Sequence, residues 1–212
     1  MRAGFFHPRL VWPLVGAMLL LAGVGRLQAS TVMEMSFEEV VSHSALAFEG
    51  RVIGMESRQL SDGSIHTYVR FAVLDVIKGD YTDEEIELSF LGGQVGSRAL
   101  QVSDMNMPEV GETGIYFVES LTRAQVHPLV GWAQGHFLLE QQSSGADIVT
   151  TVEHVPVVGI DAGAAPVTMN LSKGVAKGVT VRSSQSLLAP LSRPMSVDEF
   201  KQSVREAAAQ GQ

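Results

Sequence analysis

Apolar and polar side chains alternate along short stretches of this chain between Leu46 and Val152. The clearest stretch runs from Glu85 to Phe90, where every second residue is apolar: Ile86, Leu88 and Phe90. A period of two places the apolar side chains on one face of an extended strand. Several such stretches, separated by turn residues such as Ser61-Asp62-Gly63-Ser64, predict a mainly β fold of the sandwich or barrel type.

Two local irregularities favour a small, strongly bent barrel. Gly50 falls on the apolar face of a predicted strand, where glycine commonly marks a sharp bend or a close backbone approach. The apolar phase that ends at Val73 shifts at Leu74, as a β-bulge would produce. We therefore expect residues 30–158 to form an OB-like barrel with an interior of apolar side chains and no cavity crowded with charged groups.

Two capping boxes predict helices at the two ends of this domain. Ser36 with Glu39 begins a short helix from Phe37 to about Ser42, and Ser196 with Glu199 begins a C-terminal helix within residues 195–209. The second helix carries an apolar stripe of Val197, Phe200 and Val204. We expect this stripe to pack on the barrel, with a partner-binding helix as the alternative. Residues 159–194, rich in Gly, Ala, Ser and Pro, predict a long loop or mobile arm.

Residues 1–29 have the pattern of a signal peptide. Basic Arg2 and Arg9 precede an apolar run from Leu10 to Val24, shorter than the about 20 residues that span a bilayer. Cleavage is expected between Ala29 and Ser30, which predicts a periplasmic or secreted protein without stable membrane insertion. An uncleaved N-terminal anchor is the alternative, whereas a lipoprotein is excluded because the chain contains no cysteine.

The composition excludes several classes of function. A formal charge of −8 argues against a nucleic-acid partner, because phosphate binding needs a basic surface. The absence of cysteine excludes disulfide frameworks and thiolate-based metal or redox chemistry.

Several motifs follow one another in an order that resembles a family of uncharacterised exported bacterial proteins. Their barrel is similar to the OB-type fold of netrin-like modules and tissue inhibitors of metalloproteinases. The likeness covers about Phe37 to Val152 and rests on Glu49-Gly50-Arg51-Val52, Thr67 to Gly79, Leu91-Gly92-Gly93, Val110-Gly111-Glu112, Tyr116-Phe117-Val118 and Gly131-Trp132-Ala133-Gln134-Gly135-His136-Phe137. The tissue inhibitors present an N-terminal cysteine to the protease zinc, whereas cleavage here would expose Ser30.

The segment around Trp132 is the candidate ligand or partner surface. Trp132 and Gln134 lie between two glycines and offer an aromatic ring beside an amide, and the Gly92-Gly93 pair is included with them. The alternative is that Trp132 packs over a barrel end and that Gly92 and Gly93 are turn glycines.

No residues are predicted to bind a metal or cofactor, and none are predicted to be catalytic. His136 and Glu140 share a face of a predicted strand, but two ligands are too few for a structural zinc site. The sequence has no HExxH, GxSxG or Ser-x-x-Lys pattern and no phosphate-binding loop.

These observations predict a non-enzymatic, exported binding module with a protein partner in the envelope or medium. One alternative is an inhibitor or accessory of a secreted metalloprotease. Another is an envelope hydrolase, which would require a pocket with converging polar groups.

Overall fold

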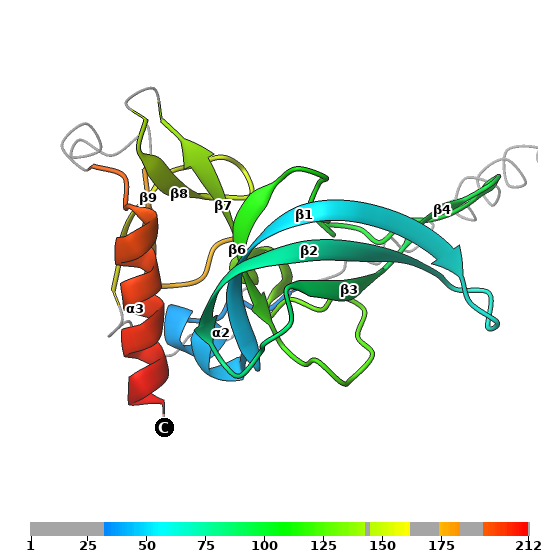
Figure 1. The fold of residues 1–212 in the computed structure, drawn as a ribbon, viewed down its shortest axis with the longest axis horizontal. Coiled ribbons are helices and arrows are strands. Elements are labelled where there is room, and N and C mark those ends of the chain that lie inside the picture. Colours follow the sequence, from blue (N-terminus) through cyan, green and yellow to red (C-terminus); the bar gives the residue numbers. More distant parts are fainter. Residues whose placement is uncertain (1–31, 143–144, 162–173, 183–192, 212) are drawn as a thin grey trace, which may run out of the picture.

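The computed structural model describes residues 32–142, 145–161, 174–182 and 193–211 (Figure 1). The predicted leader and its Ala29–Ser30 cleavage site lie outside the described residues. Within the described part of the chain, no helix is long and apolar enough to cross a bilayer.

The fold is mainly β, as the alternation predicts. A six-stranded antiparallel sheet has the order β3-β2-β1-β6-β7-β8, and two small sheets pair β4 with β5 and β9 with β10. The large sheet contains β1 (Leu46–Gln59), β2 (Ile65–Lys78), β3 (Glu85–Leu91), β6 (Thr113–Val118), β7 (His136–Gln141) and β8 (Asp147–Thr151). The remaining elements are α2 (Phe37–His43), β4 (Gly93–Val95), β5 (Arg98–Leu100), the 3-10 turn η1 (Trp132–Gly135), β9 (Val157–Ile160), β10 (Val179–Val181) and α3 (Val197–Gln210).

The expected closed barrel is not formed by the described strands. β1 and β2 form a long curved arm, but β3 and β8 remain the two ends of the sheet and do not pair with each other (Figure 1). A loop, rather than a strand, meets the outer edge of β3: the Leu91 amide donates to the Val126 carbonyl at 2.9 Å. This contact lies where closure of the barrel would require another strand.

The predicted bulge is confirmed at Leu74. Asp75 pairs with Glu49 and Val73 pairs with Gly50, so Leu74 has no opposite residue on β1. Its side chain is 52% exposed, and the phase shift therefore bends the strand without burying Leu74. At Gly50, a Cβ atom would lie 2.6 Å from the Phe48 ring, which explains why a glycine stands there.

Two apolar clusters fill the two sides of the bent sheet. One lies between β1, β2, β3 and β6 and includes Phe48, Phe71, Phe90 and Tyr116. The other is covered by both helices and includes Phe37, Phe117, Phe137, Phe200 and Val204.

Both predicted capping boxes are present. Ser36 and Glu39 cap α2 reciprocally, and Ser196 and Glu199 do the same for α3. α3 lies beside the sheet (Figure 1), and Phe200 contacts Phe137 with ring centroids 4.7 Å apart. Phe200 and Val204 are fully buried, so the α3 stripe is used inside this molecule and is not free to bind a partner.

The expectation of a loop over residues 159–194 is wrong at 159–160 and 179–181, which are strand residues. β9 and β10 pair antiparallel, with Ile160 opposite Val179. β-Branched side chains support this short ladder despite the weak alternation of the surrounding sequence. Residues 162–173 and 183–192 lie outside the described part, so the prediction of a mobile arm there stays a prediction.

Candidate functional site

Gln134 is not on an exposed surface. Its side chain is fully buried, and its amide is used entirely by the N-terminal segment and its own turn. The Oε1 atom accepts from the Met35 amide at 2.8 Å, while Nε2 donates to the Met33 carbonyl at 2.9 Å and to the Gly131 carbonyl at 3.2 Å. Gln134 therefore holds the backbone before α2 in place.

Trp132 stacks on a buried histidine. Its ring lies 5.3 Å from the His127 ring at an interplanar angle of 11°, and Trp132 itself has a left-handed backbone with φ 59°. Trp132 as a whole is half-buried. Burial lowers the pKa of His127 to about 4. The stack therefore contains a neutral imidazole at neutral pH.

Gly92 connects β3 to β4, and Gly93 is the first residue of β4. Gly92 donates from its amide to the Ile65 carbonyl at 2.7 Å, and both residues have positive φ, at 113° and 126°. A Cβ atom on Gly93 would lie 2.3 Å from the Thr67 hydroxyl oxygen. The two glycines thus serve a tight connection between strands.

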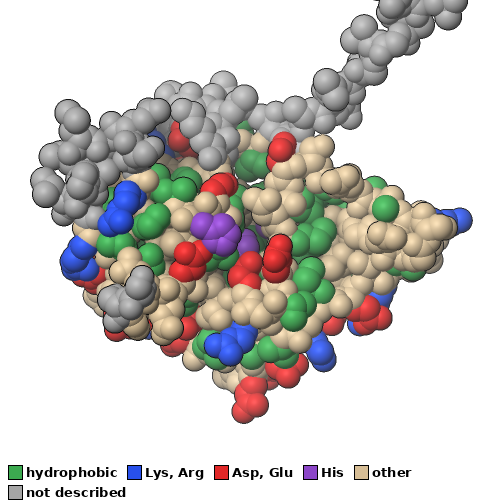
Figure 2. Space-filling view, turned by 90° about the horizontal axis from the view of Figure 1, so that it is seen from above, with side chains coloured by type: hydrophobic (Ala, Val, Ile, Leu, Met, Phe, Trp, Pro, Cys, Tyr) green, Lys and Arg blue, Asp and Glu red, His purple; other side chains and the backbone are tan. Residues whose placement is uncertain are grey.

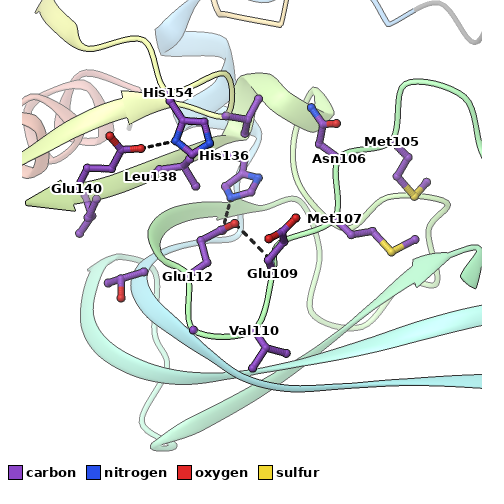
Figure 3. A pocket seen from close by; sticks show the side chains of 14 residues that line it. Met105, Asn106, Met107, Glu109, Val110, Glu112, His136, Leu138, Glu140 and His154 are labelled. Carbon is purple, nitrogen blue, oxygen red and sulfur yellow. Dashed lines mark hydrogen bonds and ion pairs between the residues drawn. The ribbon is translucent and has the colours of Figure 1, made fainter.

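A cleft that the sequence did not predict lies between residues 105–113, strand β7 and the residues Val152 and His154 that follow β8. Its volume is about 640 Å³. Histidine and acidic side chains gather near the middle of one face of the molecule (Figure 2), and the close view shows the side chains that line the cleft (Figure 3). The polar side chains among its lining residues are Asn106, Glu109, Glu112, Thr113, His136, Glu140 and His154. The expectation that no cavity would be crowded with charged groups is therefore wrong.

Glu112 is the centre of this cleft. Its Oε1 atom accepts from the Tyr116 hydroxyl at 2.8 Å and lies 2.7 Å from Nε2 of His136, and Oε2 accepts from the Glu109 amide at 3.2 Å. The residue is placed by a turn before β6, because the Val52 amide donates to the Glu112 carbonyl. Tyr116, Glu112 and His136 form one continuous hydrogen-bonded chain.

The environment keeps the Glu112 carboxyl ionised. Burial alone raises its pKa, but the hydrogen bond and charge of His136 lower it, as do the bonds from Tyr116 and the Glu109 amide. The result is a Glu112 pKa below its ordinary value. Burial and the neighbouring Glu112 charge in turn raise the pKa of Tyr116, so its hydroxyl keeps its proton.

A second pair stands at the rim of the cleft. Nδ1 of His154 contacts Glu140, and the His154 side chain is 71% exposed. The hydrogen bond with Glu140 raises the pKa of His154, and the charges of Glu140, Glu112 and Glu109 raise it further. Slight desolvation lowers this pKa but does not cancel the rise. The charges of three carboxylates therefore reach His154 at the mouth of the cleft. None of the described lining residues is a lysine or arginine.

His136 and Glu140 both line the cleft from β7, in line with the shared strand face that the sequence predicts, but they have different partners. His136 pairs with Glu112 and Glu140 pairs with His154. No group of three His, Cys, Asp or Glu side chains within the described ranges is arranged to hold a metal ion.

Two further polar atoms of the cleft lining are Nδ1 of His136 and the hydroxyl oxygen of Thr113. Nδ1 of His136 is buried and has no hydrogen-bond partner, so it is out of reach of a substrate carried by solvent. The hydroxyl oxygen of Thr113, the only hydroxyl-bearing residue among the described lining residues, accepts from Nε of Arg51 at 3.2 Å.

Comparison of the chain with protein-family models, curated proteins and solved structures found no match.

Proposed function

We propose that this protein is an exported binding module that holds part of another protein in the cleft around Glu112. The observation that carries the proposal is a preformed cleft whose ionised carboxylate is held by three hydrogen bonds from Tyr116, His136 and the Glu109 amide. Fixed polar groups beside apolar walls are typical of binding sites that need little rearrangement. Leu138, Val152 and Met107 supply the apolar wall.

Export rests on the leader pattern of residues 1–29, and a protein partner rests on the mixed apolar and acidic character of the rim. Val110 stands at that rim with 64% of its surface exposed. An exposed apolar residue next to carboxylates suits a partner that brings both apolar and polar contacts.

The experiment is affinity capture from the native envelope fraction with three forms of the mature protein. Val110→Trp narrows the mouth of the cleft, and Val126→Trp places the same ring at a 48% exposed position that does not line it. We expect a protein that is retained by wild type and Val126→Trp and lost from Val110→Trp, as judged by mass spectrometry. An identical captured set for all three forms would refute the use of this cleft.

A second candidate is the inhibition of a secreted metalloprotease, in line with the netrin-like resemblance. One observation favours it: the backbone that follows the expected cleavage site is held on two sides. Gln134 bonds to Met33 and Met35, and the Lys177 amide donates to the Met35 carbonyl at 2.8 Å. Such anchoring reduces the entropy lost when a chain end binds. Unchanged proteolysis by a secreted metalloprotease at large excess of the mature protein would remove this candidate.

A further inference from the structure

We infer that the outer edge of β3 binds an extended segment of another protein, which pairs with β3 as an added antiparallel strand. The segment places apolar side chains in a groove beside β3 and a lysine or arginine opposite Glu85. The groove shares no lining residue with the cleft around Glu112, so this inference goes beyond the proposed function and does not depend on it.

β3 is a terminal strand of the large sheet, and part of its outer edge is unpaired (Figure 1). The hydrogen bonds of an antiparallel strand alternate between its two sides. The Gly92 amide and the Glu84 carbonyl bond to β2 at 2.7 Å and 2.8 Å, and the Leu91 amide bonds away from β2. Glu87 and Ser89 therefore direct their N–H and C=O groups away from β2. None of these four groups has a hydrogen-bond partner among the residues that the structure describes.

Both ends of this unpaired stretch are occupied. The Tyr81 hydroxyl donates to the Glu85 carbonyl at 2.7 Å, and the Leu91 amide donates to the Val126 carbonyl at 2.9 Å. The distance from Glu85 to Leu91 along the strand is about 20 Å, at about 3.3 Å per residue. The unpaired stretch is thus long enough for an added strand of about five residues.

A groove of about 390 Å³ runs along the same edge. Four consecutive residues, Ile86 to Ser89, line it. Because consecutive side chains of a strand point to opposite faces, a space that touches all four residues lies beside the edge of the strand. The loop of residues 120–128 supplies most of the other lining, including Leu121, which is 45% exposed. Every second side chain of an added strand enters this groove beside Ile86 and Leu88, and an apolar side chain suits that position.

The charges near this edge indicate the other residues of the segment. Basic side chains near β3 are matched by groups of the same molecule: Arg58 by Glu56 and Glu87, Arg70 by Glu87 opposite it, Arg123 by Glu119, and His66 by the Ser89 hydroxyl. Glu85, by contrast, lies opposite Ala72 and has no ion pair within the described ranges. Because opposite charges stabilise a cross-strand pair, a lysine or arginine fits the position opposite Glu85.

A second copy of this chain is a less suitable occupant than a foreign segment. Antiparallel pairing of two β3 edges through Glu87 and Ser89 places the Glu87 side chains of the two copies opposite or diagonal to each other. Like charges in such positions destabilise the pairing, and charged residues on an edge strand oppose it in general. A foreign segment without acidic residues avoids this repulsion.

The test is a titration of the mature protein with the peptide acetyl-Thr-Val-Thr-Val-Lys-amide, followed by ¹⁵N–¹H NMR. With the lysine opposite Glu85, the central threonine bonds to Glu87, and the amides of the two valines point away from β3. We expect saturable shifts of the amides in residues 85–91 and 120–128. N-Methylation of the central threonine should weaken binding about tenfold. N-Methylation of the first valine, the matched control, should change it by less than about twofold.

Two variants of the protein test the backbone and the charge separately. Ser89→Pro removes an outward N–H and no bond to β2, and should weaken binding about fivefold relative to Ser89→Ala, which also loses the bond to His66. Glu85→Gln should weaken binding about threefold, whereas Glu109→Gln, in the separate cleft, should leave it unchanged. If Ser89→Pro does not fold, the two methylated peptides with the wild-type protein still decide the question.

Equal affinities of the two methylated peptides, or shifts that do not include β3, overturn the inference. Shifts of the β3 amides that appear on raising the protein concentration without peptide also overturn it, because they show that a second copy occupies the edge.

Discussion

Gln134 holds the backbone of Met35, 99 positions away along the chain, through a hydrogen bond of 2.8 Å from the Met35 amide to Oε1. Nε2 of the same Gln134 side chain donates to the carbonyl of Met33. One buried side chain thus fixes the path of the chain into α2.

Gln134→Leu is expected to lower the free energy of unfolding by about 2 kcal/mol or more, because it leaves the Met35 amide and the Met33 carbonyl without their partner. The measurement is urea denaturation. Gln94→Leu is the control, since Gln94 is exposed and, in the described structure, its side chain bonds to the nearby Gly96 carbonyl alone; it should change stability by less than about 0.5 kcal/mol. Equal effects of the two substitutions would show that the Gln134 bonds do not stabilise the fold.

Gly93→Ala is expected to destabilise the protein by about 3 kcal/mol or more. The new methyl would lie 2.3 Å from the Thr67 hydroxyl and 2.5 Å from the Ser57 hydroxyl, and φ is 126°. Gly96→Ala separates the two causes, because Gly96 has φ 59° with nothing within 4 Å, and should cost only about 1 kcal/mol. Thermal unfolding of both variants checks the difference. A Gly93→Ala protein as stable as Gly96→Ala would contradict the close packing.

The burial of His127 predicts that the fold loses stability as the pH falls. Its folded pKa of about 4 lies below the ordinary 6.5, so the unfolded chain binds the proton first as the pH falls. The contribution to stability is complete above about pH 6.5 and is lost progressively down to about pH 4, by roughly 3 kcal/mol in total.

Urea denaturation across this range measures that loss. His127→Gln should flatten the pH dependence of the free energy of unfolding between about pH 4 and 6.5, whereas His43→Gln, at an exposed position, should leave that dependence unchanged. Glu112 affects stability at lower pH. Its depressed pKa stabilises the fold above about pH 4.5, and this stabilisation is lost as the pH falls further. An unchanged slope in His127→Gln would refute the role of His127.

The ion pairs of Lys201 predict that this residue anchors α3 on the sheet. Nζ of Lys201 lies 3.0 Å from Asp75 and also contacts Glu49, and the Lys201 side chain is 12% exposed. Lys201→Met leaves Glu49 without its cation and should cost about 2 kcal/mol. Arg205→Met, which removes an exposed partner of the same Asp75, should cost less than about 1 kcal/mol. Hydrogen exchange of the α3 amides should be faster in Lys201→Met than in Arg205→Met, and equal rates would contradict this anchoring.

Features that depend on neighbouring residues could be predicted from the sequence. The two capping boxes need only residues three positions apart, and the bulge at Leu74 follows from a local shift of apolar phase. The open sheet could not be predicted, because closure depends on what meets the edge of β3. That contact comes from Val126, in a distant loop.

The cleft was hidden from the sequence for the same reason. Glu112 and His136 are 24 positions apart and meet because β6 and β7 are neighbours. A weak signal existed: Glu112 stands directly before a strand that is apolar on both faces and contains Tyr116. Gln134 was predicted as part of a ligand surface because a sequence does not show that the Met33–Met35 backbone covers it.

The position of α3 has a consequence for how a growing chain behaves. Phe200 and Val204 complete the same cluster that contains Phe37 and Phe117. Until these residues are synthesised, the aromatic side chains made earlier lack the cover that α3 provides, and the incomplete chain exposes part of this apolar cluster to chaperones and to other polypeptides. The cluster around Phe37 and Phe117 therefore gains its full cover only after α3 has been made.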